Sequence, residues 1–187
     1  MIANYHTHTW RCNHAQGTER EYIEQAIAGG MKILGFADHT PYPFPDGHNS
    51  SHRMFVHQTE DYFQTLTDLK KEYASQIEIH IGVEAEYYPA YFDLLTEFLK
   101  DYPCEYLLLG QHFLENEDTN EHASRIPPDP QVLKRYVNQV LEAISTGKFL
   151  YIAHPDMVKW TGDPDVYRRE MTRLCQGAKA LHCQHYH

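Results

Sequence analysis

Three histidines stand within nine positions near the start of the chain, in the stretch NYHTHTWRCNHAQG. His6 and His8 are separated by one residue, and His14 follows after a short loop. Imidazole is the commonest protein ligand for metal ions, and side chains at i and i+2 of a strand point to the same side. His6 and His8 could therefore hold one ion together. His14, taken alone, could equally be a solvated loop residue.

Further residues of the metal-ligand type follow, each near the end of a predicted strand. His39 stands in ADHT, Glu84 in GVEAEYYP, His112 in GQHF and His154 in AHPD. Any one of these residues is, by itself, most often structural or solvent-exposed. Together they place such a residue at the carboxyl end of five successive strands, which is the edge where α/β sheets and barrels bind ligands. The pattern predicts a site for several metal ions.

The donor types indicate which ions this site would take. Imidazole and carboxylate suit zinc, manganese or iron. A carboxylate such as Glu84 could bridge two ions that hold a hydroxide between them and neutralise a phosphoryl group during its transfer. The cysteines form no CxxC pair, which excludes a structural zinc finger, and Cys12 is interpreted as a small buried residue rather than a ligand. The four cysteines are Cys12, Cys104, Cys175 and Cys183.

Alternating strand-like and helix-like stretches would position these ligands. A capping box of Thr18 and Glu21 predicts a helix that ends at Gly29, and Asp129-Pro130 opens another that ends near Gly147. Further helices are expected near 62–73, 92–99 and 165–181, and strands at 2–6, 32–38, 77–86, 104–110 and 149–154. This order implies right-handed crossovers and a parallel sheet, either open or closed into a barrel.

The bulk composition limits the class of protein. The 187 residues fit a single domain, and the net charge of −10 disfavours a nucleic-acid partner. No apolar run predicts a membrane span and no secretory signal is evident, so we expect a cytoplasmic protein without a membrane partner. Two long polar loops, 40–57 and 113–128, are candidates for binding loops.

These motifs, in this order and spacing, resemble those of the PHP (polymerase and histidinol phosphatase) superfamily, and most closely its histidinol-phosphatase branch. The resemblance runs from residue 4 to about 156. It implies a distorted (β/α)7 barrel with a trinuclear metal site. About five βα units of that barrel are expected in this chain. It also implies hydrolysis of L-histidinol phosphate to L-histidinol and phosphate in histidine biosynthesis, by a hydroxide that bridges two ions.

The resemblance implies a role for each ligand. His6, His8 and Glu84 resemble the ligands of a first ion, while Glu84, His112 and His154 resemble those of a second and would be the catalytic residues. His14 and His39 resemble two ligands of a third ion. The expected cofactors are two or three divalent ions of zinc, manganese or iron.

The chain departs from the family pattern at its end. Members continue to a late strand with an Asp-x-His motif, and none follows His154 here. We therefore expect a single PHP domain over residues 1–187 without its last strands, and an irregular tail at 182–187. The tail histidines could instead act as surrogate ligands; they are His182, His185 and His187. An open seam beside the first and fifth strands would favour a homo-oligomer that buries it.

Substrate contacts are expected from the two long loops. Arg53 and Arg125 could bind the phosphate of a small phosphorylated substrate, although either could be a solvated surface residue. Tyr42, Phe44 and Tyr88 could line the pocket. The sequence predicts a metal-dependent phosphomonoesterase. The alternative is a catalytically impaired metal-binding remnant of such a phosphatase.

Overall fold

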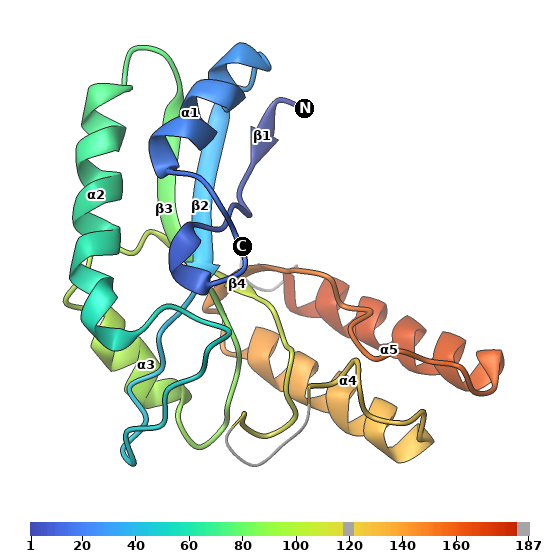
Figure 1. Ribbon diagram of the computed structural model, residues 1–187. Helices are drawn as coiled ribbons and strands as arrows, with labels where there is room; N and C mark the ends of the chain where they lie inside the picture. Colours follow the sequence, from blue (N-terminus) through green and yellow to red (C-terminus); the bar gives the residue numbers. More distant parts are fainter. Residues whose placement is uncertain (118–121, 183–187) are drawn as a thin grey trace. The chain divides into compact units, whose positions relative to one another are not determined.

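The computed structural model describes residues 1–117 and 122–182 and divides the chain into two compact units (Figure 1). The first unit consists of Met1–Ala85 and Asp93–Leu108. The second consists of Glu86–Phe92 and Leu109–His187. Part of the predicted loop 113–128, and the tail residues Cys183, His185 and His187, lie outside the described residues.

The first unit is built on parallel strands with helices between them. Strand β2 (Ile33–His39) pairs with the short β1 (Ala3–Asn4) on one side and with β3 (Glu78–Ala85) on the other, and both pairings are parallel. The order continues to β4 (Tyr106–Leu109). In the β2–β3 register Ile33 lies opposite Glu78 and His39 lies opposite Glu84. Two residues 45 positions apart in the sequence therefore become neighbours at one sheet edge.

The helices of this unit lie within a few residues of their predicted positions. Helix α1 (Glu19–Ala28) starts with the Thr18–Glu21 capping box and ends at Gly29. Helix α2 (Thr59–Glu72) follows a short 3₁₀ turn, η2 (Val56–Gln58), and lies alongside β3 (Figure 1). Helix α3 (Phe92–Leu99) leads toward β4. Apolar side chains at helical spacing explain the packing, since Tyr62, Phe63, Leu66 and Leu69 of α2 are all buried.

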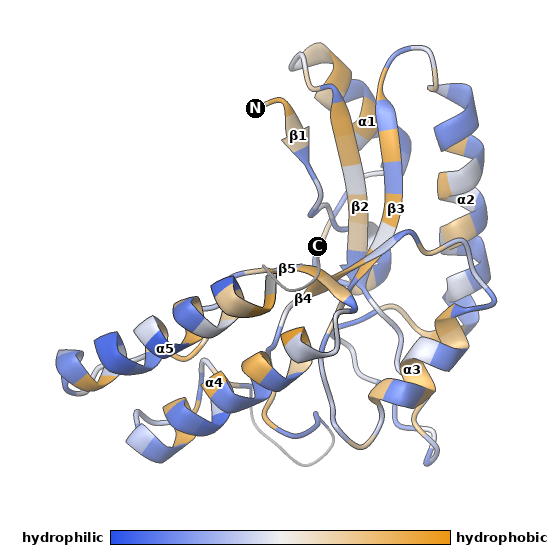
Figure 2. Cartoon of the chain, turned by 180° about the vertical axis from the view of Figure 1, so that it is seen from behind, coloured by the Kyte–Doolittle hydropathy of each residue, from blue (hydrophilic) through white to orange (hydrophobic). Residues whose placement is uncertain are grey.

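The second unit pairs two helices with one strand. Helix α4 (Pro130–Ser145), capped by Asp129, and helix α5 (Pro164–His182) lie side by side (Figure 2). The two helices pack closely at Gly177 of α5, where a Cβ would collide with the Leu141 side chain of α4. Strand β5 (Phe149–Ile152) runs beside the end of β4, where the Ala153 N–H donates to the Leu109 carbonyl at 2.9 Å. The predicted α/β class and parallel sheet are confirmed.

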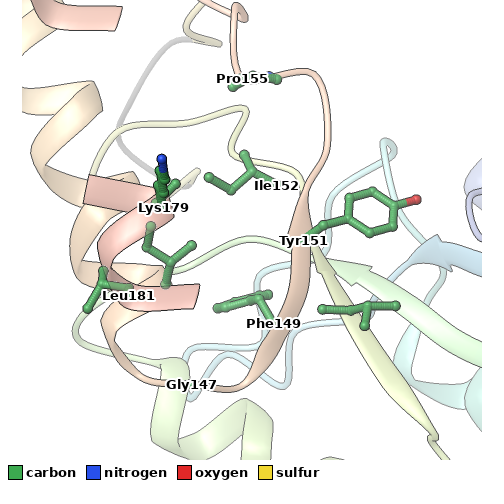
Figure 3. A pocket seen from close by; sticks show the side chains of 10 residues that line it. Gly147, Phe149, Tyr151, Ile152, Pro155, Lys179 and Leu181 are labelled. Atoms are coloured by element: carbon green, nitrogen blue, oxygen red, sulfur yellow. The ribbon is translucent and has the colours of Figure 1, made fainter. Parts of the chain in front are cut away.

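An apolar pocket of about 450 Å³ lies in the second unit, between β5 and the end of α5 (Figure 3). Phe149 and Ile152 of the strand region face Leu181 and Lys179 of the helix. Lys179 is the charged group among its lining residues. The pocket therefore offers no set of metal donors.

Strand β1 is shorter than the predicted strand at 2–6, so the expectation that His6 and His8 end this strand is wrong. The Asn4 carboxamide accepts the His6 N–H at 3.0 Å, and the Tyr106 hydroxyl donates to the Tyr5 carbonyl at 2.7 Å. These side chains form hydrogen bonds with the backbone N–H and carbonyl groups that a longer β1 strand would use to pair with β2. One further link to β2 remains, from the Ala37 N–H to the Thr7 carbonyl.

The predicted strand at 149–154 is also too long, because β5 ends at Ile152. His154 has a φ of 33°, which extended backbone does not adopt. This residue therefore lies beyond the strand rather than at its end. Among the described residues, no helix has the length and apolar character needed to cross a membrane.

Tyr106 explains two glycines of the central strands. A Cβ at Gly82 would lie 2.6 Å from the Tyr106 carbonyl oxygen and 2.7 Å from its ring. A Cβ at Gly35 would collide with the Tyr106 hydroxyl and the Tyr5 backbone. Glycine is required at both positions because the Tyr106 side chain lies directly over the sheet.

Candidate metal centre

Glu84 stands at the centre of a group of imidazoles in the first unit. Its Oε2 lies 3.2 Å from Nε2 of His6, 3.2 Å from Nε2 of His8 and 3.1 Å from Nδ1 of His39. The Nε2 atoms of His6 and His8 are 3.0 Å apart, although neither residue belongs to β1. The carboxylate is 1% exposed, whereas the three imidazoles are part-exposed. Several ring nitrogens and one carboxylate oxygen thus converge on a small volume.

A second buried carboxylate holds this group in place. Asp38, which precedes His39 and is fully buried, accepts hydrogen bonds from the Thr9 N–H and hydroxyl and from the His39 N–H. Its Oδ1 also lies 3.3 Å from Nδ1 of His8. A carboxylate that binds the second nitrogen of a ligating histidine fixes both the tautomer and the orientation of the ring. Asp38 therefore orients His8 so that Nε2 faces Glu84.

These carboxylates make the centre attractive to positive charge. Burial lowers the pKa of His8, but its hydrogen bonds with Asp38, Cys12 and Glu84 outweigh burial and raise that pKa to about 11. Without a metal ion, a proton on His8 supplies the positive charge that the carboxylates favour. A divalent cation would supply the same charge in its place.

His14 reaches the same centre from a short loop. The 3₁₀ turn η1 (Trp10–Cys12) is capped by Thr9, and Asn13 then adopts the left-handed conformation with a φ of 65°. Asparagine tolerates this conformation better than most residues, and the turn directs the chain back toward the sheet. The His14 ring centroid lies 5.4 Å from that of His8 and 5.1 Å from that of His39. His14 is exposed, yet its ring lies beside those of His8 and His39, so its role as a ligand stays a prediction.

Arg11 anchors this loop to two helices. Its guanidinium is 2% exposed and binds the carboxylates of Glu19 at the start of α1 and Asp61 in the first turn of α2. Burial alone would lower the pKa of Arg11, but the two carboxylates raise it above its usual value. The loop that carries His14 is thus fixed at its middle by ion pairs from a buried guanidinium to the buried Glu19 and the exposed Asp61.

The second unit contains the other two predicted ligands. The ring centroids of His112 and His154 lie 5.0 Å apart. Glu86, which is 2% exposed, accepts the backbone N–H groups of His112 and Phe113 at 3.0 and 2.9 Å, and its Oε1 lies 3.3 Å from Nδ1 of His112. The positive φ of His154 is a strained backbone of the kind that clusters at functional sites.

The two predicted substrate arginines differ in their surroundings. Arg53, in the first unit, is 3% exposed and donates from Nη1 to the Thr40 carbonyl at 2.9 Å. Its guanidinium lies over the Tyr42 ring, so the solvated-surface interpretation is wrong for this residue. Arg125, in the second unit, is exposed. Tyr42, Phe44 and Tyr88 are buried, and Tyr42 stacks on Phe44.

The donors of the first unit fit a divalent cation. Ligand atoms of His8, His39 and Glu84 all lie within 4.8 Å of one another, and so do those of His8, Cys12 and His14. Neutral imidazole with carboxylate is a donor set that zinc and related ions prefer. The first unit therefore brings together five of the seven predicted ligands, while His112 and His154 meet in the second.

Two supporting carboxylates were not predicted from the sequence. Asp38 directly precedes His39, and Glu86 follows Glu84 by two positions. An acidic residue next to a predicted ligand could have served as a signal, because ligating histidines usually donate their second N–H to a carboxylate or carbonyl.

Comparison with known proteins places these residues in a known fold. The model of the PHP domain family matches residues 4–181. "Probable histidinol-phosphatase" of Deinococcus radiodurans is 30% identical over 173 residues, which cover 88% of this chain and 65% of that protein. Histidinol-phosphatase of Bacillus subtilis is 34% identical over 121 residues, 61% of this chain and 45% of that protein. The chain thus spans less than two thirds of each of these relatives.

A solved structure shows the same fold. The crystal structure of histidinol phosphate phosphatase from Lactococcus lactis, in complex with zinc, L-histidinol and phosphate, matches with a TM-score of 0.75 and 18% identity. The match covers 96% of this chain and 70% of that one. The family match extends over most of the sequence, from the first histidine pair to helix α5. The chain belongs to the PHP domain family.

Proposed function

We propose that this chain is a metal-dependent phosphomonoesterase that hydrolyses L-histidinol phosphate to L-histidinol and phosphate. The observation that carries the proposal is the convergence of three imidazoles on Oε2 of the buried Glu84. The names of the two bacterial relatives and the ligands of the Lactococcus lactis structure support this choice of substrate. The place of the reaction in histidine biosynthesis follows from that substrate.

The proposal assigns two or three ions of zinc, manganese or iron to the centre. His6, His8 and Glu84 would hold the first ion, and His14 and His39 would contribute to the third. His112 and His154 would serve the second ion, for which Glu84 is the proposed bridge. The finer architecture proposed is one PHP domain built as an incomplete (β/α)7 barrel, with a second copy covering its unpaired edge.

The chemistry divides between the ions and the protein. Bound divalent ions would lower the pKa of a water molecule and neutralise charge on the phosphate. The protein fixes the donors, since Asp38 orients His8 and Glu86 orients His112. Arg53 and Arg125 are proposed to bind phosphate oxygens. Addition of water breaks the ester P–O bond and leaves the alcohol and inorganic phosphate.

The test compares metal-depleted with metal-loaded protein. The full chain, stripped by a chelator, should release no phosphate from L-histidinol phosphate, and zinc, manganese or iron(II) should restore the release. A second candidate is the impaired metal-binding remnant, which would bind ions through the imidazoles around Glu84 without hydrolysing the substrate. Stoichiometric metal binding without phosphate release would refute the proposed activity and support that candidate.

A further inference from the structure

The loop that carries His14 also carries a thiol that the proposed function does not use. Cys12 is fully buried, and its Sγ donates to the Thr9 carbonyl at 3.0 Å. Cys12, His8 and His14 each contribute one possible ligand atom, and these three atoms lie within 4.8 Å of one another. Two nitrogens and one sulfur at this separation could reach a single ion.

His8 belongs to two such groups but can serve only one ion through a given nitrogen. Its Nε2 faces His6 and Glu84 at 3.0 and 3.2 Å, while its Nδ1 faces Asp38. The Nε2 atom of His8 is therefore committed to the ion at Glu84. An ion at His14 needs another donor, and Cys12 lies next to His14 on the same turn.

The hydrogen bonding of His14 prepares it to bind such an ion. Its Nδ1–H donates to the Cys12 carbonyl at 2.8 Å. A proton on Nδ1 leaves the lone pair on Nε2, which is the tautomer that a ligating histidine adopts when its other nitrogen binds a carbonyl. The η1 turn and the left-handed Asn13 thus present the Cys12 thiol and the His14 imidazole together.

We infer that Cys12 binds as a thiolate to the ion held by His14, and that this position selects zinc over manganese. Thiolate is a soft ligand that suits zinc, whereas manganese prefers oxygen donors. On binding, a sulfur–metal bond replaces the S–H bond and the proton leaves to solvent. The Thr9 carbonyl keeps a second donor, the Cys12 N–H at 3.3 Å. The inference rests on the proposed metal centre but not on turnover.

Cobalt(II) provides a direct test, because thiolate ligation gives an intense near-ultraviolet charge-transfer band that nitrogen and oxygen donors do not give. The full chain loaded with cobalt should show this band. Cys12→Ser should abolish the band while cobalt remains bound at Glu84. The matched control is Cys104→Ser, which changes a thiol that hydrogen-bonds the Tyr106 carbonyl and should leave the band intact. A band that survives Cys12→Ser would overturn the inference.

X-ray absorption at the zinc edge tests the same point on the unaltered chain, in case Cys12→Ser does not fold. Zinc–sulfur scattering at about 2.3 Å is expected in addition to zinc–nitrogen and zinc–oxygen scattering at about 2.0–2.1 Å. With zinc bound at both His14 and Glu84, the absence of sulfur scattering would refute the inference. Neither spectrum depends on phosphate release, so failure of the proposed activity would be seen separately.

Discussion

Glu84 and Glu86 are separated by one residue, and both are almost fully buried, yet their surroundings differ in kind. Oε2 of Glu84, in the first unit, faces nitrogens of three imidazoles. Oε2 of Glu86, in the second unit, accepts two backbone N–H groups, and its Oε1 lies 3.3 Å from Nδ1 of His112. A cation can replace protons shared among imidazoles and a carboxylate, but it cannot replace backbone amide donors. Glu84 is therefore suited to bind a metal, and Glu86 to position a histidine.

Asp38 extends this comparison within the first unit. Like Glu86, it accepts the backbone N–H of a predicted ligand, here His39, and it contacts the ring of His8. Each unit thus contains a buried carboxylate that accepts the backbone N–H of one predicted ligand and contacts the imidazole of a predicted ligand. Substitutions at these three acids should separate ligand from supporting roles.

The largest effect is expected for Glu84→Gln. The amide removes the negative charge on which three imidazoles converge, so the ion at His6 and His8 should be lost and any phosphate release should fall by about 10³-fold or more. Elemental analysis and phosphate assays would measure both. The control is Glu78→Gln on the same strand, an exposed carboxylate that should change neither quantity. Unchanged turnover in Glu84→Gln would mean that the activity comes from a contaminant.

A smaller effect is expected for Asp38→Asn. The amide keeps one acceptor oxygen, for either the Thr9 donors or the His39 N–H, and it no longer carries the charge that favours the Nδ1 proton of His8. Loss of such a supporting group typically lowers metal affinity by about 10–100-fold. Calorimetric titration with zinc would measure the change, with the exposed Asp68→Asn of α2 as control. Unaltered affinity would show that Asp38 serves the fold alone.

Glu86→Gln should affect stability more than metal binding in the first unit. The substitution replaces one carboxylate oxygen, which accepts hydrogen bonds, by an NH2 group, which cannot accept them. The expected loss in the free energy of unfolding is about 1 kcal/mol. Denaturant unfolding would measure it, and the exposed Glu115→Gln is the comparison. If Glu86→Gln instead released the ion at Glu84, the distinction between the two glutamates would be wrong.

The smallest effect on folding is expected for Arg125→Ala, because this side chain is exposed. The free energy of unfolding should change by less than about 0.5 kcal/mol. Arg53→Ala should destabilise the chain more, since its buried guanidinium binds the Thr40 carbonyl. A higher KM for L-histidinol phosphate in folded Arg125→Ala would then report a phosphate contact, and an unchanged KM would remove this residue from the proposed site.

The sequence predicts the elements well because their signals are local. Capping residues such as Thr18 and Asp129, and apolar residues at helical spacing, locate the helices to within a few residues. The strand ends at 2–6 and 149–154 are less well predicted, because side chains from elsewhere, such as Tyr106, take over backbone groups there. No local pattern reveals a hydrogen bond between residues about a hundred positions apart.

By itself, the sequence determines the α/β order, the family and the residue types that could bind metal. These follow from periodicity and from motifs within short stretches. Only the tertiary structure shows that His39 lies beside Glu84, that Asp38 and Glu86 support ligands, and that Arg53 is buried. Burial and convergence depend on strand register and on packing between segments remote in sequence, and the same acidic residue binds an ion or a backbone amide according to which segment the fold brings to it.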